Sequence, residues 1–202
     1  HHQNEMGAET SIGMAALQGM NLLNLGMYEQ AGKIGEDLVN ALKQSVPFEA
    51  LYSFVFIEKV GKALANLQKP YLERPNRDVT VPMSAETVGR GKHIYIPVEV
   101  NGIDTGCSFG NFVSEKYAKE INLKIVADSI PVSGMEIGFV KLATADSIKI
   151  GELVYHNPVF MIAPPDNEVD SVFAFDGVLG YHFIRDAKEI IIDNEAGQFV
   201  FP

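Results

Sequence analysis

The feature that most constrains the fold of this chain is a change in the spacing of its apolar residues. Up to about Gln68 the apolar residues recur at helical spacing, without the strict alternation of half-buried strands. Beyond Lys92 the chain consists of short β-branched and aromatic runs that are separated by turn residues. Residues 69–92 contain several prolines and no clear periodicity. The sequence therefore predicts a helical part followed by a mainly β part.

We expect three helices in the first part. An apolar run over residues 15–25 ends at Gly26, a second helix runs from Tyr28 towards Leu42, and a third covers residues 48–67. Small or tightly packing residues occur where a tetratricopeptide-like helix pair has them, at Gly19, Gly26, Tyr28 and Ala31. This resemblance covers one such unit only. The alternative is a plain helical bundle, which we favour.

The second part reads as short strands with one helix among them. The helix covers residues 114–121, with Ser114 available as its N-cap. The predicted strands cover residues 93–100, 140–143, 147–150, 159–162, 189–193 and 198–201. We therefore expect an α+β chain: a helical domain at 1–75, a linker at 76–92 and a β domain at 93–202.

Composition and charge exclude several classes of function. The net charge is −10 and no Lys/Arg cluster is present, so nucleic acid is not an expected partner. A single cysteine allows no internal disulfide, and no Cys/His set has zinc-ligand spacing. No apolar run approaches the ~20 residues that a membrane helix needs, so we expect no membrane span.

Two motifs carry the candidate chemistry. The first, Asp104-Thr105-Gly106, follows a predicted strand and precedes a loop that leads into the helix at Ser114. The second covers residues 176–184 and includes Val178-Leu179-Gly180. In this order they resemble the retropepsin-like aspartic protease family, especially the bacterial aspartyl proteases with one catalytic motif per chain. The resemblance extends over residues 93–202.

The resemblance implies a mostly antiparallel, β-barrel-like acid-protease domain with Asp104 as the catalytic aspartate. It also implies that the 178–180 strand crosses beneath the active-site loop, and that no metal or organic cofactor takes part. For Asp176, a hydrogen-bonding role near the active-site floor and a plain turn role remain alternatives. The residues implied to support the active site are Thr105, Gly106, Asp176, Gly177 and Gly180.

Metal-free peptide hydrolysis by carboxyl groups needs two of them. One carboxylate deprotonates a water while the other carboxyl protonates the substrate carbonyl. Like charges about 3 Å apart cannot both ionise, so activity at acidic to mildly acidic pH is expected. A chain with one Asp-Thr-Gly obtains its second carboxyl by two-fold pairing with itself. We therefore expect an aspartic endopeptidase that is a homodimer and acts on peptides or proteins.

In the family, a mobile hairpin covers an extended substrate. The candidate hairpin here covers residues 132–139, and an ordinary hairpin without a lid function is the alternative. Its predicted substrate-binding flap residues are Gly134, Met135, Glu136, Ile137 and Gly138.

The chain departs from the family just before Asp104. Where the family has several residues of a second strand, only Ile103 separates the Asn101-Gly102 turn from the aspartate. Either the amino-terminal hairpin is shortened or residues are absent from the sequence, and we favour absent residues.

Two other functions are compatible with these residues. Gly106-Cys107-Ser108-Phe109-Gly110 also fits a serine hydrolase elbow, with Asp170 or Asp176 and then His182 in suitable order. The short strands after Ile121 argue against it, because that fold needs repeated strand–helix units. A catalytically inactive peptide-binding or assembly module on the same fold is the other alternative. The family resemblance favours an extracytoplasmic location in a bacterium.

Overall fold

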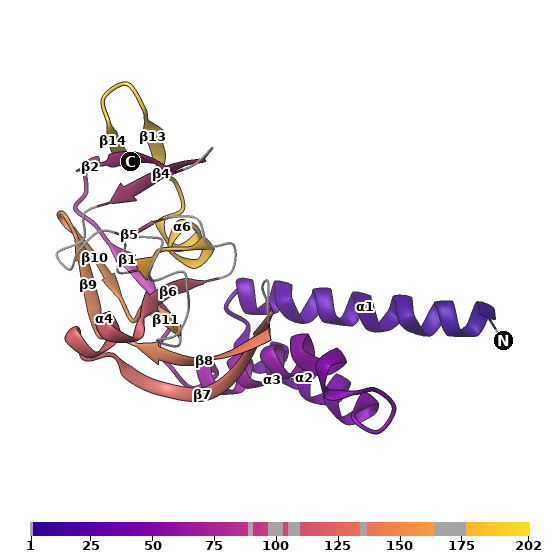
Figure 1. The fold of residues 1–202 in the computed structure, drawn as a ribbon. Helices are drawn as coiled ribbons and strands as arrows, with labels where there is room; N and C mark the ends of the chain where they lie inside the picture. Colours follow the sequence, from indigo (N-terminus) through magenta and orange to yellow (C-terminus); the bar gives the residue numbers. More distant parts are fainter. Residues whose placement is uncertain (1, 89–90, 97–102, 105–109, 134–136, 164–176) are drawn as a thin grey trace. The chain divides into compact units, whose positions relative to one another are not determined.

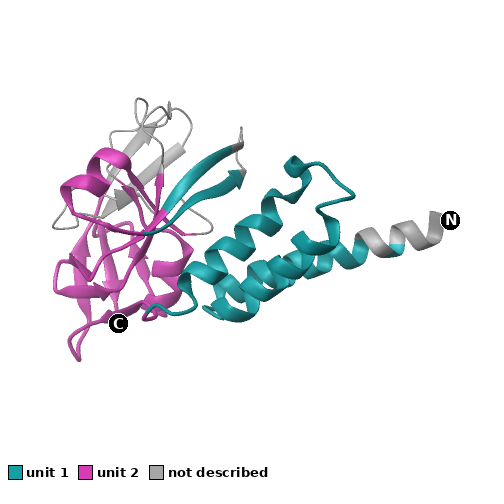
Figure 2. Cartoon of the chain, turned by 90° about the horizontal axis from the view of Figure 1, so that it is seen from below, with its two compact units in different colours: residues 1–67, 126–141 teal, residues 68–125, 142–202 magenta. Residues whose placement is uncertain are grey.

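The computed structural model describes residues 2–88, 91–96, 103–104, 110–133, 137–163 and 177–202. The chain has α+β structure, with helices first and then a mostly antiparallel sheet region. Two compact units are coloured in Figure 2. Unit 1 comprises residues 1–67 and 126–141, and unit 2 comprises residues 68–125 and 142–202. The domain boundaries that we predict from the sequence stay a prediction.

Unit 1 contains the helices α1 (His2–Asn24), α2 (Tyr28–Leu42) and α3 (Tyr52–Leu64), with a 3₁₀ turn, η1 (Phe48–Leu51), before α3. Helix α1 ends as expected at Gly26, which has a positive φ of 69°. The Gly26 amide donates to Leu23 O and the Met27 amide donates to Leu22 O, which is a Schellman motif. Gly26 therefore separates α1 from α2 because its backbone conformation favours glycine.

Helices α2 and α3 approach each other through glycines that the sequence pattern did not single out. A Cβ at Gly35 would lie 2.4 Å from Glu58 N, and one at Gly61 would lie 2.4 Å from Gly32 N. Only a hydrogen in the side-chain position permits backbone contact this close. Of the residues predicted for a tetratricopeptide-like pair, Gly19 packs so closely that an added Cβ would lie 3.0 Å from the Ile57 side chain, and Ala31 is buried. The tetratricopeptide assignment stays a prediction.

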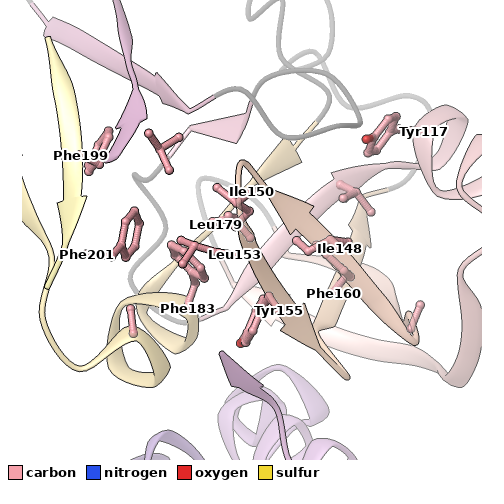
Figure 3. Packing of buried hydrophobic residues seen from close by; sticks show 14 of the residues in the cluster. Tyr117, Ile148, Ile150, Leu153, Tyr155, Phe160, Leu179, Phe183, Phe199 and Phe201 are labelled. Carbon is pink, nitrogen blue, oxygen red and sulfur yellow. The ribbon is translucent and has the colours of Figure 1, made fainter. Parts of the chain in front are cut away.

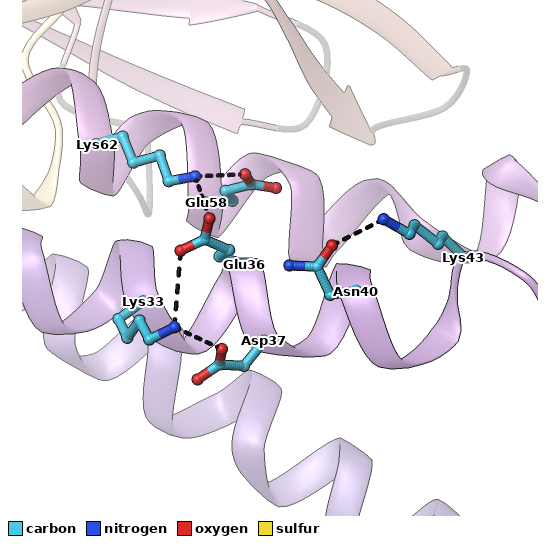
Figure 4. A network of polar contacts seen from close by, with 7 residues as sticks. All are labelled: Lys33, Glu36, Asp37, Asn40, Lys43, Glu58 and Lys62. Carbon is cyan, nitrogen blue, oxygen red and sulfur yellow. Dashed lines mark hydrogen bonds and ion pairs between the residues drawn. The ribbon is translucent and has the colours of Figure 1, made fainter.

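Exposed ion pairs join the same two helices (Figure 4). Lys62 Nζ lies 2.8 Å from Glu58 Oε1 on its own helix and 3.0 Å from Glu36 Oε1 on α2. The hydrogen bond from Lys62 and its charge lower the pKa of the Glu36 carboxyl. Lys33 extends the network to Glu36 and Asp37. Exposed pairs contribute little stability, so the glycine contacts rather than these charges determine how closely α2 and α3 pack.

The strands form three sheets, and most of the strands are labelled in Figure 1. The largest sheet has the order β3-β4-β5-β12-β6-β11-β8-β7, and the others are β1-β10-β9 and β13-β14-β2. Parallel pairing occurs between β11 and β6 and between β12 and β5. The strands are β1 (Tyr71–Glu73), β2 (Val79–Pro82), β3 (Ser84–Val88), β4 (Gly91–Ile96), β5 (Ile103–Asp104), β6 (Asn111–Ser114), β7 (Lys124–Ser133), β8 (Ile137–Thr144), β9 (Ser147–Ile150), β10 (Leu153–His156), β11 (Val159–Ala163), β12 (Gly177–Val178), β13 (Ile191–Asp193) and β14 (Gln198–Phe201).

Two short helices complete unit 2, α4 (Glu115–Glu120) and α6 (Tyr181–Ala187). Ser114 caps α4 as predicted, because its Oγ accepts a hydrogen bond of 3.1 Å from Tyr117 N. The predicted strands at 147–150 and 198–201 are confirmed as β9 and β14. The expectation of no periodic structure at 69–92 was wrong, because β1, β2 and β3 lie there. The prolines misled it: Pro82 ends β2, and a strand end tolerates a residue without an amide hydrogen.

The core of unit 2 gathers side chains of β2, β6, β8, β9, β10, β11 and β14 together with those of α4 and α6 (Figure 3). Strands β2, β9, β10 and β14 alternate buried and less buried residues, as expected for strands with one face on a core. Phe183 of α6 packs edge-on against Tyr155 and Phe201, with ring centroids 5.4 and 6.1 Å apart. The buried Phe183 ring of α6 therefore contacts strands from two different sheets.

Two further expectations concern closure and membranes. Among the residues that the structure describes, the sheets have an open hydrogen-bond order and no closed barrel is found. No helix in the described ranges is both long enough and apolar enough to cross a bilayer.

The close contact between α2 and α3 is testable with Gly61→Ala. Its added methyl group would lie 2.4 Å from Gly32 N and 2.7 Å from Tyr28 O, so the helices must move apart. We expect the free energy of unfolding to fall by roughly 1–3 kcal/mol, measured by urea denaturation followed by circular dichroism. Gly13→Ala is the control, because no atom lies within 4 Å of its added Cβ. Equal stability of both variants would contradict this packing.

Candidate functional site

Asp104 ends a two-residue strand that has a neighbour on each side. In β5, Asp104 is paired with Tyr95 of β4 in the antiparallel direction and with Val178 of β12 in the parallel direction. Ile103 is paired in the same way with Ile96 and Gly177. The pairing with β4 gives the hairpin before Asp104 a short second strand. Because strands flank β5 on both edges, the backbone of Asp104 occupies an interior position of the sheet.

Strand β12 lies between two strands that are consecutive in the described chain. It pairs in parallel with β5 and antiparallel with β6, where Gly177 is opposite Val113 and Val178 is opposite Phe112. Strands β5 and β6 are therefore neighbours in sequence and not in the sheet. The two motifs singled out in the sequence are brought together by this insertion.

The insertion is tight enough to require glycine at position 177. A Cβ there would lie 2.6 Å from Phe112 O and 2.9 Å from Val113 Cγ1. The neighbour that a methyl group would meet is backbone, which cannot turn away as a side chain can. Gly177 was expected among the supporting residues, and this contact gives a physical reason for a glycine there.

Asn111 is a buried polar residue beside this insertion, and the sequence analysis did not assign it a role. Its side chain accepts a hydrogen bond of 3.0 Å from Gly180 N and donates one of 2.9 Å to Val159 O. Only 1% of the residue is exposed. Gly180, also among the predicted supporting residues, is buried and stands before the first residue of α6. The sequence signal that could have identified Asn111 is a polar residue directly before the apolar Phe112-Val113 pair of a strand.

Helix α6 carries a buried histidine, His182, next to the start of β6. A Cβ at Gly110 would lie 4.0 Å from His182 Nδ1 and 3.1 Å from Met161 Cε. Burial, together with the nearby Arg185 charge, lowers the pKa of His182 to about 4. His182 is therefore neutral at neutral pH.

A second set of polar contacts fixes α6 to the strand behind it. Asp186 accepts hydrogen bonds of 2.8 Å from Tyr155 Oη and 2.7 Å from Arg185 Nε. Tyr155 is fully buried on β10. The helix that follows the second motif is thus held at both ends, by Gly180 to Asn111 and by Asp186 to Tyr155.

The predicted flap corresponds to two strands that are neighbours in the sheet order. Strand β7 ends at Ser133 and β8 begins at Ile137. Within unit 1, Lys59 Nζ donates a hydrogen bond of 2.7 Å to Ser129 O, and the rings of Tyr52 and Phe139 are 6.3 Å apart. Helix α3 therefore contacts both strands of this hairpin. Its role as a flap stays a prediction.

Several predicted site residues lie outside the described residues. They are Thr105, Gly106, Asp176, Gly134, Met135 and Glu136. For Asp104 and Ile137 the structure describes the backbone only, whereas Gly138 is half-buried in β8. The assignment of catalytic, supporting and flap roles therefore stays a prediction.

The serine hydrolase alternative places its nucleophile at Ser108, which with Cys107, Phe109 and Asp170 is also outside the described residues. A nucleophile elbow leads from a strand directly into a helix. Here Gly110 leads into the strand β6 instead. The local order of elements after Gly110 thus argues against this alternative.

The part of the chain that is described was also searched for a metal centre and for grooves. No group of three His, Cys, Asp or Glu residues in those ranges has metal-binding geometry. A shallow groove runs along α1, and all of its lining residues are uncharged. They are Ser11, Met14, Ala15, Leu17, Gln18, Asn21, Leu22 and Leu25.

Comparisons with known proteins gave one structural likeness to report. No family model matches the chain, and no curated protein matches it. The chain is similar to the crystal structure of a retropepsin-like aspartic protease from Rickettsia conorii, with 17% identity and a TM-score of 0.41. The match covers 66% of this chain and 95% of that chain. It concerns the course of the backbone alone.

Burial of His182 predicts a pH dependence of stability. An unfolded histidine titrates near 6.5, whereas folded His182 titrates at about 4, so the unfolded chain binds more protons between these values. Stability attributable to His182 is complete above pH 6.5 and is lost as the pH falls towards 4. The gap corresponds to roughly 3 kcal/mol.

We expect His182→Gln to remove most of this slope. The free energy of unfolding of both proteins is measured by urea denaturation at pH 7 and at pH 4. The parent protein should lose more stability between these two pH values than His182→Gln does. Parallel pH dependence of the two proteins would show that His182 does not titrate in this way.

Proposed function

We propose that the protein is an aspartic endopeptidase that hydrolyses peptide bonds with a water molecule activated by Asp104 from each of two chains. The observation that carries the proposal is the insertion of β12 between β5 and β6. It joins the Asp-Thr-Gly motif to the second motif, with Val178 directly opposite Asp104. If the Asp-Thr-Gly sequence had arisen by chance, there would be no reason for its strand to pair with the second motif.

The geometry suits a catalytic carboxyl because it fixes the main chain from which the carboxyl extends. Strands β4 and β12 pair with both edges of β5, and Gly177 allows β12 to pack closely on β6. General acid–base catalysis depends on groups held within hydrogen-bond reach of the reacting atoms. A residue on a free loop would lose more conformational entropy on reaching that position.

The chemistry needs a second carboxyl, and a second copy of the chain would provide it by two-fold symmetry. In this reaction the ionised carboxylate takes a proton from water, and the water oxygen bonds to the peptide carbonyl carbon. The protonated carboxyl gives its proton to the carbonyl oxygen. As the tetrahedral intermediate collapses, one of its hydroxyl groups returns a proton to the second carboxylate and the C=O bond re-forms. The first carboxyl gives its proton to the leaving nitrogen, and the C–N bond breaks. No net proton is gained or lost by the pair.

The substrate class follows from the same arrangement. An extended peptide is bound by main-chain hydrogen bonds as an added strand, and the hairpin of β7 and β8 is the candidate cover. The contacts of Lys59 and Tyr52 with this hairpin support a role of α3 in positioning its two strands. The substrates proposed are therefore peptides or extended segments of proteins.

Asp104→Asn is the decisive substitution. Because the amide can neither accept a proton from water nor share one with a second carboxyl, cleavage of a denatured protein substrate should fall about 100-fold to 10 000-fold. Asp146→Asn is the matched control, since Asp146 is an exposed carboxyl in unit 2, away from β5 in sequence. We expect it to retain full activity. A peptide-binding module without turnover would instead bind its ligand equally in both variants and cleave nothing.

Dependence on two chains is tested by dilution. Specific activity should fall with protein concentration as the active pair dissociates, while the pH optimum stays acidic to mildly acidic. The measurement is cleavage rate against concentration, alongside the solution mass. Full activity of a particle with the mass of one chain would rule out the shared site.

A further inference from the structure

Asn111 stands out because its side chain is both buried and polar. Among the described residues, the buried polar or charged ones are Asn111 and His182. Asn111 bonds to Gly180 N at 3.0 Å and to Val159 O at 2.9 Å, so its two bonds go to main-chain groups of two separate segments. One segment is the start of β11, and the other is the junction of β12 with α6. Its amide therefore links three parts of the chain.

The two partners require an amide at this position. Gly180 N needs an acceptor and Val159 O needs a donor, and a side-chain amide supplies both at once. An ionised carboxylate has no proton to donate to Val159 O. An aliphatic side chain would leave both buried main-chain groups without this bond. The chemistry of the contact is thus specific to asparagine in shape and in hydrogen-bonding capacity.

The position of Asn111 connects it to Asp104. Asn111 is the first residue of β6, and the next residue, Phe112, pairs with Val178. Val178 pairs on its other edge with Asp104. The end of β5 and the start of β6 are therefore both fastened to the segment from Val178 to Gly180. The β5 end is held by strand pairing, and the β6 end is held by strand pairing and by the Asn111 amide.

We propose that Asn111 is a positioning residue for the catalytic carboxyl. By holding Gly180 to the start of β6, its amide fixes the segment against which Asp104 is paired, and so fixes the point from which the carboxyl is presented. Asn111 does not touch the reacting atoms in this role. The expected effect on catalysis rests on the proposed function. The expected effect on the position of the Asp104 carboxyl does not.

The first test is the kinetics of Asn111→Leu. Loss of both bonds should displace Asp104 and lower kcat about 100-fold, the loss expected from a misplacement of about 1 Å, while KM changes by less than about threefold. Activity is measured well below the melting temperature of each variant, so that all of the protein is folded.

Asn111→Asp gives a pH signature. When the introduced carboxyl is protonated, its O–H donates to Val159 O and its carbonyl accepts from Gly180 N, which restores both bonds. When it is ionised, the donor is lost. We expect kcat near that of the parent protein at the acid end of the profile and a growing defect relative to the parent as the pH rises. A constant ratio of the two rates across pH would overturn the proposal.

Tyr155→Phe is the control for a merely structural effect. It removes the 2.8 Å hydrogen bond to Asp186, a partly buried contact of α6 in which no residue of β5, β6 or β12 takes part. We expect it to lower the melting temperature yet leave kcat unchanged. If Tyr155→Phe lowers kcat as much as Asn111→Leu, or if Asn111→Leu keeps its kcat, Asn111 is a stability residue only.

A last measurement separates failure of this proposal from failure of the proposed function. The ¹³C resonance of the Asp104 carboxyl is followed across pH in the parent protein and in both variants. Asn111→Leu should move its titration midpoint or chemical shift, and Tyr155→Phe should leave them unchanged. An unmoved resonance in Asn111→Leu overturns the positioning role. If Asp104→Asn leaves cleavage unaffected, or the parent cleaves nothing, the protease proposal fails, and the resonance alone then decides the role of Asn111.

Discussion

The pairing of β12 with both β5 and β6 is the constraint on which the rest of the candidate site depends. Without it, the strand that ends at Asp104 and the strand that follows would be free to pair with each other as an ordinary hairpin. With it, a segment from late in the chain separates them, and the close contact of Gly177 with Phe112 O leaves no room for a side chain. A long-range pairing of this kind fixes the Asp104 backbone only after most of unit 2 has folded.

The residues around this insertion stabilise it by packing and by a few buried polar contacts. Leu179 is fully buried, and Phe183 of the following helix lies among the aromatic rings of the unit 2 core. Asn111 supplies the hydrogen bonds that apolar packing cannot, because buried main-chain groups are costly when unpaired. The buried His182 lowers the stability of the folded state at low pH, because its pKa is lowered by burial. An acid-active enzyme on this fold would therefore balance its catalytic pH range against the protonation of this buried imidazole.

The helical unit includes most of the hairpin of β7 and β8. Residues 126–141 group with the helices, Ile130 and Val140 are buried, and Lys59 and Tyr52 of α3 contact Ser129 and Phe139. Helices α2 and α3 approach closely at Gly35 and Gly61. The hairpin, whose role as a substrate cover is our proposal, therefore packs within unit 1 on a closely packed helix pair.

Local pattern predicted the helices of the first part and several strands of the second, and it identified the two motifs. The stop of α1 at Gly26, the Ser114 cap and the strands at 147–150 and 198–201 all depend on residues close in sequence. Sequence alone did not find β1, β2 and β3, because short strands between prolines form only when partners such as β10, β14 and β4 supply hydrogen bonds. Nor did it assign Asn111, whose partners are 48 and 69 residues away. Tertiary structure decided these features because strand pairing and buried polar contacts are satisfied by residues that only folding brings together.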